Sequence, residues 1–329
     1  MATTDEQPGA IVGPEPFLNS GEDVPSIPVT GLTTDPNLWV SLYQGTWVLT
    51  TLVPGIVSIQ QSFTPRRGDV VLASLPKSGT TWLKALAFAT IARGAYPPAA
   101  TDAAAHPLLR LNPHQCVPFM ERLFAAGEEG AMDTLPSPRL MSTHMHHSIL
   151  PTSITNNPHC KIIYICRDPK DMLVSFWHFV KKLSPKITFA DVFEAACNGT
   201  SVYGPIWDHL LGYWNASKAS PETVLFLRYE EMLRDPAGNV RKLAMFVGQP
   251  FSPAEEESGV VEQIVKLCSI DKLKSLEVNK AGSCSPFAND WYFRRGGKGD
   301  WANHMTPDMA RRLDVIVEEK LSGSGLSFA

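Results

Sequence analysis

The chain has 329 residues and a formal net charge of −4, with 29 Lys and Arg against 33 Asp and Glu. This length is sufficient for one large α/β domain or two modest ones, with a sizeable core. The acidic balance argues against nucleic acid as the main partner, so any anion site must be local and built from a few Lys and Arg side chains.

The first part of the chain differs in composition from the rest. Residues 1–35 are rich in Pro, Gly, Asp, Glu and Thr and show little periodicity, which predicts a disordered leader before a domain over 36–329. We find neither a secretory signal nor an apolar stretch long enough to span a bilayer. The six cysteines are scattered without metal-ligand spacing. We therefore expect a cytoplasmic protein with no membrane partner.

The domain reads as alternating strands and helices. Residues 38–63 are apolar and aromatic, which suits a segment packed over a pocket or core. Runs of apolar residues predict strands at 70–74, 139–142, 161–166 and 223–228. Helical patterns fall at 80–93, 116–127, 169–182, 188–196, 204–218 and 236–248. Apolar strands separated by helices indicate an α/β fold, a single domain with a central parallel sheet flanked by helices.

A phosphate cradle is predicted where the first of these strands meets the first helix. The segment 75–82 reads Leu-Pro-Lys-Ser-Gly-Thr-Thr-Trp, a Ser/Gly/Thr turn that opens a helix. Free N–H groups and the positive dipole end of such a helix face an anion. The usual P-loop, G-x-x-x-x-G-K-[ST], is absent because the lysine here precedes the turn. An ordinary strand-to-helix turn is the alternative interpretation.

A second anion-binding element follows the strand at 161–166. Arg167 lies at the carboxyl end of that strand, where ligands of open α/β sheets bind. Its guanidinium suits a phosphate, and the hydroxyl of Ser175, about two turns into the next helix, could reach the same ligand. An ion pair with Asp171 is the structural alternative for Arg167.

The segment 279–300 is too polar for a core and is expected to form a surface loop or a lid. In it, Arg294 and Arg295 precede a Gly-rich turn, a cationic loop able to wrap a second phosphate. A solvated run of charge is the alternative. Together, the three basic elements suit a nucleotide that carries phosphates at two separate places.

His144 follows the strand at 139–142, near these anion sites, and is a candidate general base. His146 and His147 lie close by in the chain and suggest a metal site. No carboxylate or cysteine completes a ligand set locally, so no metal is expected.

The four motifs occur in the order seen in cytosolic sulfotransferases, and the chain resembles the plant branch of that family over roughly residues 38–328. The resemblance implies a P-loop-nucleotide-kinase-like sulfotransferase fold. It also implies transfer of a sulfonate group from 3′-phosphoadenosine-5′-phosphosulfate (PAPS), leaving 3′-phosphoadenosine-5′-phosphate (PAP). The acceptor would be a hydroxyl of a small, largely hydrophobic metabolite, such as a flavonoid, a steroid or other terpenoid hormone, or a phenolic.

Carried over position by position, the resemblance implies a role for each motif residue. Lys77 would stabilise charge on the leaving 5′-phosphate, and His144 would take the proton from the acceptor hydroxyl. The 5′-phosphate of the donor would contact Ser78, Gly79, Thr80 and Thr81. Its adenine would contact Trp82, Tyr229 and Ser269. Its 3′-phosphate would contact Arg167, Ser175, Arg294, Arg295 and Gly296.

Some positions depart from the best-known pattern. Ser142 stands where animal members carry a lysine, although plant relatives commonly lack it too, and Arg295 replaces the lysine of the usual Arg-Lys-Gly. The lysine that opens the animal dimer motif falls at Ala302, so we expect a monomer or a weak dimer. Two alternatives stay open, an ATP-dependent phosphotransferase of the P-loop type and a nucleotide-binding protein without turnover. The first is disfavoured because no lysine follows the glycine turn.

Overall fold

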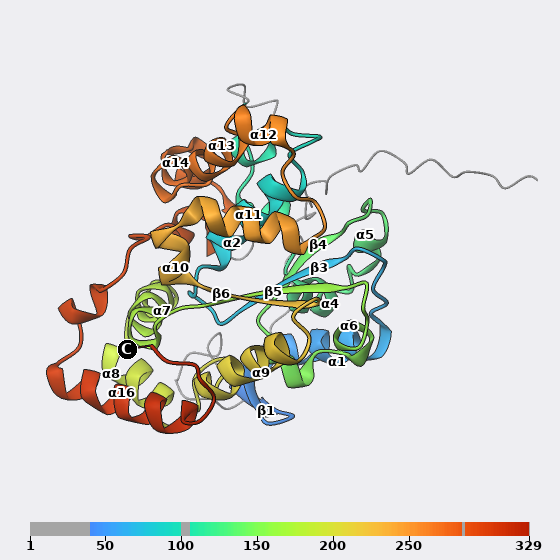
Figure 1. Cartoon of the computed structure of the whole chain (residues 1–329). Helices are drawn as coiled ribbons and strands as arrows, with labels where there is room; N and C mark the ends of the chain where they lie inside the picture. Colours follow the sequence, from blue (N-terminus) through green and yellow to red (C-terminus); the bar gives the residue numbers. More distant parts are fainter. Residues whose placement is uncertain (1–39, 100–105, 285–286, 329) are drawn as a thin grey trace, which may run out of the picture.

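A computed structural model of the chain describes residues 40–99, 106–284 and 287–328, so the predicted leader at 1–35 lies outside the described residues (Figure 1). The centre of the described part is a sheet formed by β3 (Val70–Ser74), β4 (Leu140–Thr143), β5 (Lys161–Cys166) and β6 (Val224–Arg228). Its strands all run parallel in the order β4-β3-β5-β6. The predicted strands are therefore confirmed to within one residue at each end.

Helices cover both faces of this sheet (Figure 1). Alternate side chains of one strand enter different cores, because successive residues of a strand point to opposite faces. Val71 belongs to the core packed by α1 (Val53–Ser62), α7 (Pro169–Leu183), α9 (Ile206–Ala219) and α16 (Pro307–Leu321). Leu72 belongs to the core packed by α2 (Thr80–Ile91), α11 (Pro236–Phe246) and α13 (Val260–Leu267). The α/β fold with a parallel central sheet is confirmed.

The predicted helix at 116–127 is not continuous. The structure has α3 (Pro113–Cys116) and α4 (Met120–Ala125), with an extended link between them. Pro118 lies in this link, and its carbonyl oxygen accepts hydrogen bonds from the backbone N–H (2.8 Å) and the hydroxyl (2.9 Å) of Ser142 in β4. Because a proline disfavours a helical conformation at the residue before it, the chain extends and α4 begins beside the end of β4.

The apolar segment at 38–63 forms the hairpin β1 (Val40–Tyr43) and β2 (Thr46–Leu49), a 3-10 helix η2 (Thr50–Leu52) and α1. Residues Leu49 and Leu52 line the large cavity described below, so the expected packing over a pocket is confirmed. Figure 1 shows the hairpin on the same side of the sheet as α9.

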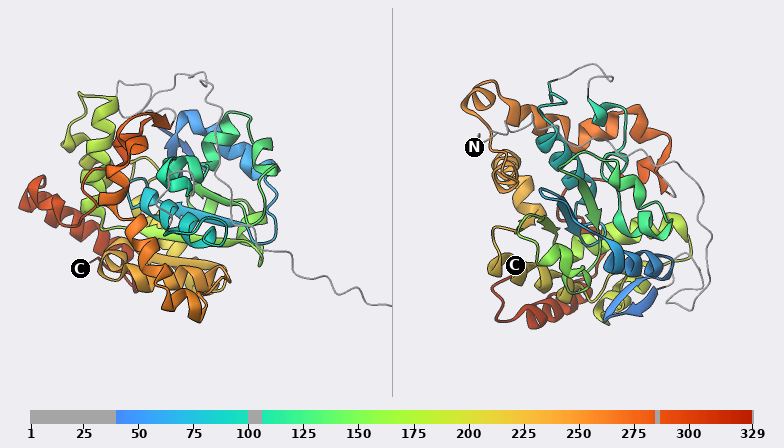
Figure 2. Two further views of the ribbon diagram at one scale, coloured as in Figure 1. Left: turned by 90° about the horizontal axis from the view of Figure 1, so that it is seen from above. Right: turned by 90° about the vertical axis from the view of Figure 1, so that its right-hand side faces the viewer.

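Figure 2 shows α16, in red, on the outer side of the molecule. The remaining elements complete the described part of the chain. They are η3 (Pro107–Leu109), α5 (Gly130–Asp133), η4 (His147–Ile149), α6 (Thr152–Thr155), α8 (Phe189–Cys197), α10 (Tyr229–Arg234), α12 (Pro253–Glu257), α14 (Ile270–Ser275), α15 (Glu277–Lys280), β7 (Ser283–Cys284), β8 (Phe287–Ala288), η5 (Asn289–Tyr292) and η6 (Asp300–Asn303). Among the described helices, none combines the length and the apolar character needed to cross a bilayer.

Most of the described residues of the polar segment at 279–300 are exposed or half-buried, but three of its polar side chains are buried. Asn279 and Asn289 are each 2% exposed and Asp300 is 6% exposed. The Asn279 amide bonds the Leu273 carbonyl (2.9 Å), and the Asn289 amide bonds the Val278 carbonyl (2.7 Å). The composition of this segment predicts that it is too polar for a core, and the hydrogen bonds compensate for the burial of these few polar groups.

Candidate active site

A cavity of about 890 Å³ opens at the carboxyl ends of the parallel strands. Residues that follow each strand line it, because the ends of parallel strands meet at one edge of a sheet: Lys77 after β3, His144 after β4, Arg167 after β5 and Tyr229 after β6. The predicted site residues that line this cavity are Lys77, Gly79, Thr80, Thr81, Trp82, His144, Arg167, Ser175, Tyr229, Arg294, Arg295 and Gly296.

Two predicted residues lie outside the lining. Ser78 is buried, and its backbone N–H is donated to the carbonyl oxygen of Leu75 (3.2 Å). The Ser269 hydroxyl caps α14 by accepting from the Lys272 N–H (3.2 Å), while its neighbour Ile270 lines the cavity.

The cradle turns sharply between β3 and α2. Lys77 has φ 69° and Gly79 has φ 106°, in the left-handed region that favours glycine. A Cβ at Gly79 would lie 2.8 Å from Cδ2 of Tyr229. The backbone N–H groups of Gly79, Thr80 and Thr81 donate no hydrogen bond to any of the described residues. The turn therefore presents free N–H groups and a helix N-terminus to the cavity, an arrangement that binds anions.

The Lys77 ammonium lies 4.3 Å from the centre of the Phe179 ring. Burial, with the charges of Arg167, Lys182 and Arg294, lowers the pKa of Lys77 to about 7. In the absence of an anion, this lysine is therefore only partly charged at neutral pH.

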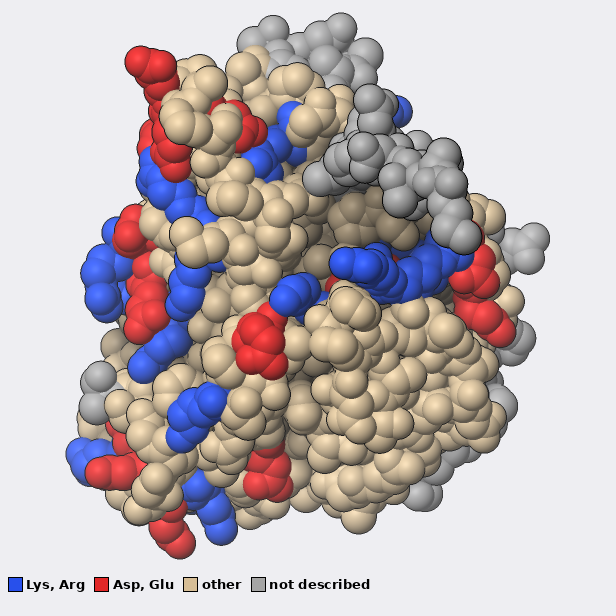
Figure 3. Space-filling model, turned by 45° about the vertical axis from the view of Figure 1, so that its right-hand side comes forward, with Lys and Arg blue, Asp and Glu red and all other residues tan. Residues whose placement is uncertain are grey.

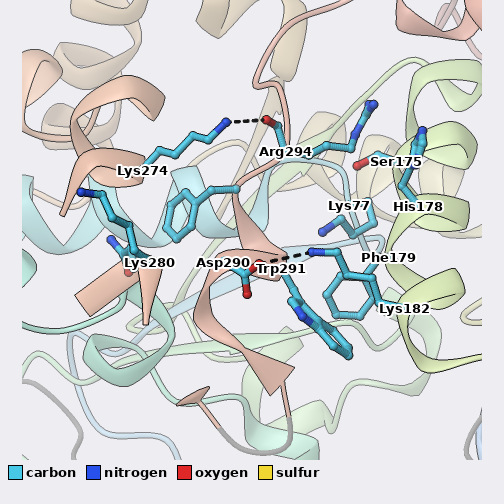
Figure 4. A pocket seen from close by; sticks show the side chains of 12 residues that line it. Lys77, Ser175, His178, Phe179, Lys182, Lys274, Lys280, Asp290, Trp291 and Arg294 are labelled. Atoms are coloured by element: carbon cyan, nitrogen blue, oxygen red, sulfur yellow. Dashed lines mark hydrogen bonds and ion pairs between the residues drawn. The ribbon is translucent and has the colours of Figure 1, made fainter. Parts of the chain in front are cut away.

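A second cavity, of about 530 Å³, shares Lys77 with the first (Figure 4). Basic side chains dominate its lining, and Figure 4 shows the Arg294 side chain extending toward Ser175. The Lys274 ammonium donates to the Arg294 carbonyl oxygen (3.4 Å). The other basic residues around this cavity are Lys182 and Lys280, so its potential is positive.

Arg167 connects the cradle to the Gly-rich loop. Its guanidinium donates to the carbonyl oxygens of Gly297 (2.8 Å) and Lys77 (3.4 Å) and lies 4.7 Å from the centre of the Tyr229 ring. The alternative partner, Asp171, is 4.0 Å away. The Asp171 carboxylate instead accepts a hydrogen bond from the N–H of Gly299 (2.6 Å). The ion pair between Arg167 and Asp171 is therefore present but is not the main contact of either side chain.

Asp300 holds both arginines of the loop, since Arg294 and Arg295 each donate to its carboxylate. Burial alone would raise the pKa of Asp300, but hydrogen bonds from Arg294 and Asn303 and the two arginine charges hold it at about 2. Gly296 has φ 72°, and a Cβ there would lie 2.7 Å from Cγ1 of Ile270.

One group of possible metal ligands occurs among the described residues. His178, Asp300 and His304 each place a ligand atom within 4.8 Å of the others. The Asp300 carboxylate is already bound by two arginines, whose positive charges oppose a cation at the same oxygens. Within this group, the Asp300 carboxylate therefore serves as the partner of the two arginines and not as a metal ligand. The group is also separate from the histidines around His144 that the sequence analysis considered.

His144 is held in one tautomer. Its Nδ1 lies 2.6 Å from the carbonyl oxygen of Ser74, which can only accept, so Nδ1 carries the proton and Nε2 is free to accept one. The rings of Phe119 (5.0 Å) and Tyr203 (5.3 Å) flank the imidazole. Burial lowers the pKa of His144 to about 4. The ring is therefore neutral at physiological pH, as a general base must be.

Three charged side chains near His144 were not predicted from the sequence. Lys84 lines the cavity and donates to Nδ1 of His114 (3.1 Å) and to the Val117 carbonyl oxygen (3.0 Å). Glu121 is fully buried and accepts the backbone N–H of His144 (2.7 Å). The third is Arg122, which also lines the cavity. The available signal was a single charge inside an apolar helical run, as in Leu-Lys-Ala-Leu at 83–86.

The apolar wall of the cavity differs in part from the expected one. The expected segments 39–63 and 106–124 contribute, for example through Leu52 and Phe119, but none of residues 145–150 lines the cavity. Met145 and Ile149 lie in the core instead. The other apolar lining residues include Phe176, Phe179, Val180, Leu183, Val202, Tyr203, Phe287 and Tyr292.

An anion cradle, an arginine loop and a neutral histidine, all at the carboxyl edge of a parallel α/β sheet, define a nucleotide-dependent group-transfer enzyme. Comparison with known proteins gives its family. The family model described as the sulfotransferase domain matches residues 67–325. The chain therefore belongs to the sulfotransferase family and is an enzyme of that class.

Similar proteins include plant sulfotransferases. Flavonol 3-sulfotransferase of Flaveria bidentis is 45% identical over 293 residues, 86% of this chain and 91% of that protein. Cytosolic sulfotransferase 1 of Arabidopsis thaliana is 43% identical over 302 residues, 89% of this chain and 91% of that protein.

Solved structures of sulfotransferases share the fold. An Arabidopsis thaliana sulphotransferase, 38% identical, superposes with a TM-score of 0.70 over 88% of this chain and 89% of that one. Mouse sulfotransferase SULT7A1 complexed with PAP, 26% identical, gives 0.65 over 87% of this chain and 95% of that one. The sulfotransferase fold expected from the sequence is confirmed.

Proposed function

We propose that the protein transfers the sulfonate group of PAPS to a hydroxyl of a small, largely hydrophobic metabolite, without a metal ion. The observation that carries this proposal is the meeting of the Lys77 cradle, the arginine loop and neutral His144 around one cavity. The PAP complex of the mouse relative supports the choice of donor.

The donor would span the two basic elements of the cavity. The N–H groups of Gly79, Thr80 and Thr81 would bind its 5′-phosphate. The 3′-phosphate would bind Arg167 and Ser175 together with Arg294, Arg295 and the Gly296 backbone. The adenine would lie near Trp82 and Tyr229, whose rings meet edge-to-face at 5.6 Å. Ser78 and Ser269 would act indirectly, because the Ser78 backbone N–H and the Ser269 hydroxyl are already bonded within the protein.

In the proposed reaction, Lys77 and His144 carry the chemical step. Nε2 of His144 takes the proton of the acceptor hydroxyl as its oxygen forms a bond to sulfur. The bond between sulfur and the bridging oxygen of the 5′-phosphate breaks, and its electron pair stays on the leaving phosphate of PAP. The Lys77 ammonium stabilises the charge that develops on that oxygen. Fixed cationic groups of the protein thus supply the electrostatic stabilisation.

The wall of the cavity supports the proposed acceptor class. Aromatic side chains such as Phe119, Phe176 and Phe287 suit a planar or hydrophobic molecule such as a flavonoid, a steroid or other terpenoid hormone, or a phenolic. Two similar plant proteins are named flavonol sulfotransferases. We further propose that the enzyme works in the cytosol, as the names of several relatives suggest, and as a monomer or weak dimer.

The experiment is incubation of the protein with PAPS labelled in the sulfonate and with a plant metabolite extract, with EDTA present. Products are identified by a mass gain of one sulfonate, and Lys77→Met and His144→Gln serve as matched inactive variants. Labelled products that both variants fail to form support the proposal. Transfer that requires Mg²⁺ and ATP, with no product from PAPS, would establish a phosphotransferase instead.

A further inference from the structure

Arg122 is a charged side chain in the apolar part of the cavity without a charged partner. It lies on α4 and lines the cavity beside Phe119. Its guanidinium forms no hydrogen bond or ion pair with any described residue, and the closest aromatic partner is Phe287, with 5.6 Å to the ring centre. Arg122 is half-buried, and an arginine side chain that is withdrawn from water is normally paired.

None of the neighbouring charged side chains that the structure describes forms an ion pair with Arg122. The Lys84 ammonium is a second cation, held by His114 and a carbonyl oxygen and not by a carboxylate. Glu121 uses one carboxylate oxygen to accept from His144 and Thr143. Burial raises the pKa of Glu121 to about 7, so this carboxylate is only partly charged at neutral pH.

Glu128, the other acidic side chain near this wall, lines the cavity but forms no ion pair with Arg122. Lys84 and Arg122 thus lie near Glu121 and Glu128 at this end of the cavity, but neither carboxylate forms an ion pair with Arg122. On the face drawn in Figure 3, Lys and Arg side chains form a band across a hollow, above a broad area without charged residues.

A guanidinium with no counter-ion at an apolar wall favours an anionic ligand. Partial burial lowers the pKa of Arg122, because it removes water from the charged form. A carboxylate, sulfate or phosphate oxygen pair matches the two N–H bonds that a guanidinium offers in parallel. A neutral ligand would displace water from Arg122 and return no ionic contact.

We propose that Arg122 is an anion-binding subsite for the acceptor, so that the preferred acceptor carries an anionic group in addition to the hydroxyl that receives the sulfonate. This inference rests on the proposed function of the same cavity. It narrows the acceptor class to hydroxylated metabolites with a carboxylate, sulfate or phosphate placed away from the reacting hydroxyl. Arg122 then sets specificity and takes no part in the chemical step.

The test uses plant metabolites separated by anion exchange into a neutral pool and an acidic pool, each incubated with labelled PAPS. The wild-type protein is expected to label mainly the acidic pool. For the acceptor found there, its anionic group is then blocked, as the methyl ester for a carboxylate, and the two forms are compared. We expect kcat/KM to fall by about tenfold or more, the size of a lost charge-assisted hydrogen bond.

The variants are Arg122→Met, which removes the charge, and Arg122→Lys, which keeps it. Arg122→Met should raise KM for the anionic acceptor about tenfold with little change in kcat, and should leave KM for the blocked form unchanged. Arg122→Lys should restore part of the affinity. Arg110→Met is the matched control, because Arg110 is exposed and outside the cavity lining.

Two outcomes would overturn this inference and leave the proposed function intact. One is wild-type protein that labels the neutral pool at least as strongly as the acidic pool. The other is an Arg122→Met variant whose KM for the anionic acceptor equals that of the wild type. Wild-type protein that labels neither pool would instead contradict the proposed function, and the inference with it.

Discussion

His144 Nδ1 lies 2.6 Å from the carbonyl oxygen of Ser74, the last residue of β3. The proposed phosphate cradle begins directly after that strand, so one backbone segment holds both the proposed base and the proposed donor site. The contact orients the imidazole and leaves Nε2 facing the cavity. A change in the cradle backbone is therefore expected to disturb the base as well as donor binding.

The first prediction concerns His144 and pH. His144→Gln should lower kcat by about 10²- to 10⁴-fold, the usual contribution of a general base, with little change in PAP affinity. Because burial lowers the pKa of His144 to about 4, its active neutral form persists down to that pH. At saturating donor, kcat should stay nearly constant from pH 7.5 to 5.5 and should decrease only as the pH approaches 4. A decrease centred near pH 6.5 would contradict this.

The second prediction concerns Lys77, whose pKa is lowered to about 7 in the free protein. A bound phosphate favours the charged lysine and raises that pKa, so binding takes up protons above pH 7. PAP affinity should be greatest near pH 7 and should decrease by up to about tenfold per pH unit between pH 7 and 9.

Isothermal titration in buffers of different ionisation enthalpy measures this proton uptake. Lys77→Met should bind PAP more weakly and without this dependence on pH. Equal proton uptake by the variant and the wild type would show that another group titrates.

The third prediction compares two adjacent glycines of the loop. Gly296→Ala should weaken PAP binding by about tenfold or more, because Gly296 has φ 72° and an added Cβ would lie 2.7 Å from Ile270. Gly297→Ala is the control, since a Cβ there meets no atom within 4 Å and its φ is not in the left-handed region. Equal affinities of the two variants, measured by titration calorimetry, would refute a role for this backbone conformation.

The fourth prediction concerns stability away from the cavity. Arg139 directly precedes β4, and Asp69 directly precedes β3. Their side chains form an ion pair with an N–O distance of 2.6 Å and are almost fully buried, at 1% and 0% exposure. Arg139→Met would leave the Asp69 carboxylate buried and unpaired, a loss of about 3–5 kcal/mol in the free energy of unfolding.

Urea denaturation measures this change. The exposed pair of Arg312 and Glu194 provides the control, since Arg312→Met should leave the denaturation midpoint nearly unchanged. A similar midpoint for both variants would show that the buried pair does not stabilise the sheet.

The strands were predictable because they are short, apolar and buried on both faces. The run Val70–Ser74 has no polar face, and this pattern indicates a central parallel strand whatever the rest of the chain does. The prediction of one helix at 116–127 was wrong because it rested on periodicity alone. Periodicity does not show that Pro118 extends the chain and exposes its carbonyl oxygen to Ser142.

Most motif residues that line the cavity could be picked out in the sequence, because they lie at a strand end or in a Gly-rich turn, whereas Ser175 and Trp82 lie within helices. Arg294 and Arg295 were recognised as a cationic loop, but their joint carboxylate partner Asp300 was not. The charged residues Lys84 and Arg122 were missed because a single charge in an apolar helical run, the only local signal, does not show that the side chain lines a cavity.

By itself, the sequence determined the class of fold and indicated the cradle, Arg167, the arginine loop and His144 as the parts of the proposed site, since each is a short-range pattern of residue types. Only the tertiary structure decided the state of these groups: the tautomer of His144, the lowered pKa of Lys77 and the unpaired charge of Arg122. These properties depend on burial and on neighbours distant in the chain, which are brought together only when the strand ends meet at one edge of the sheet.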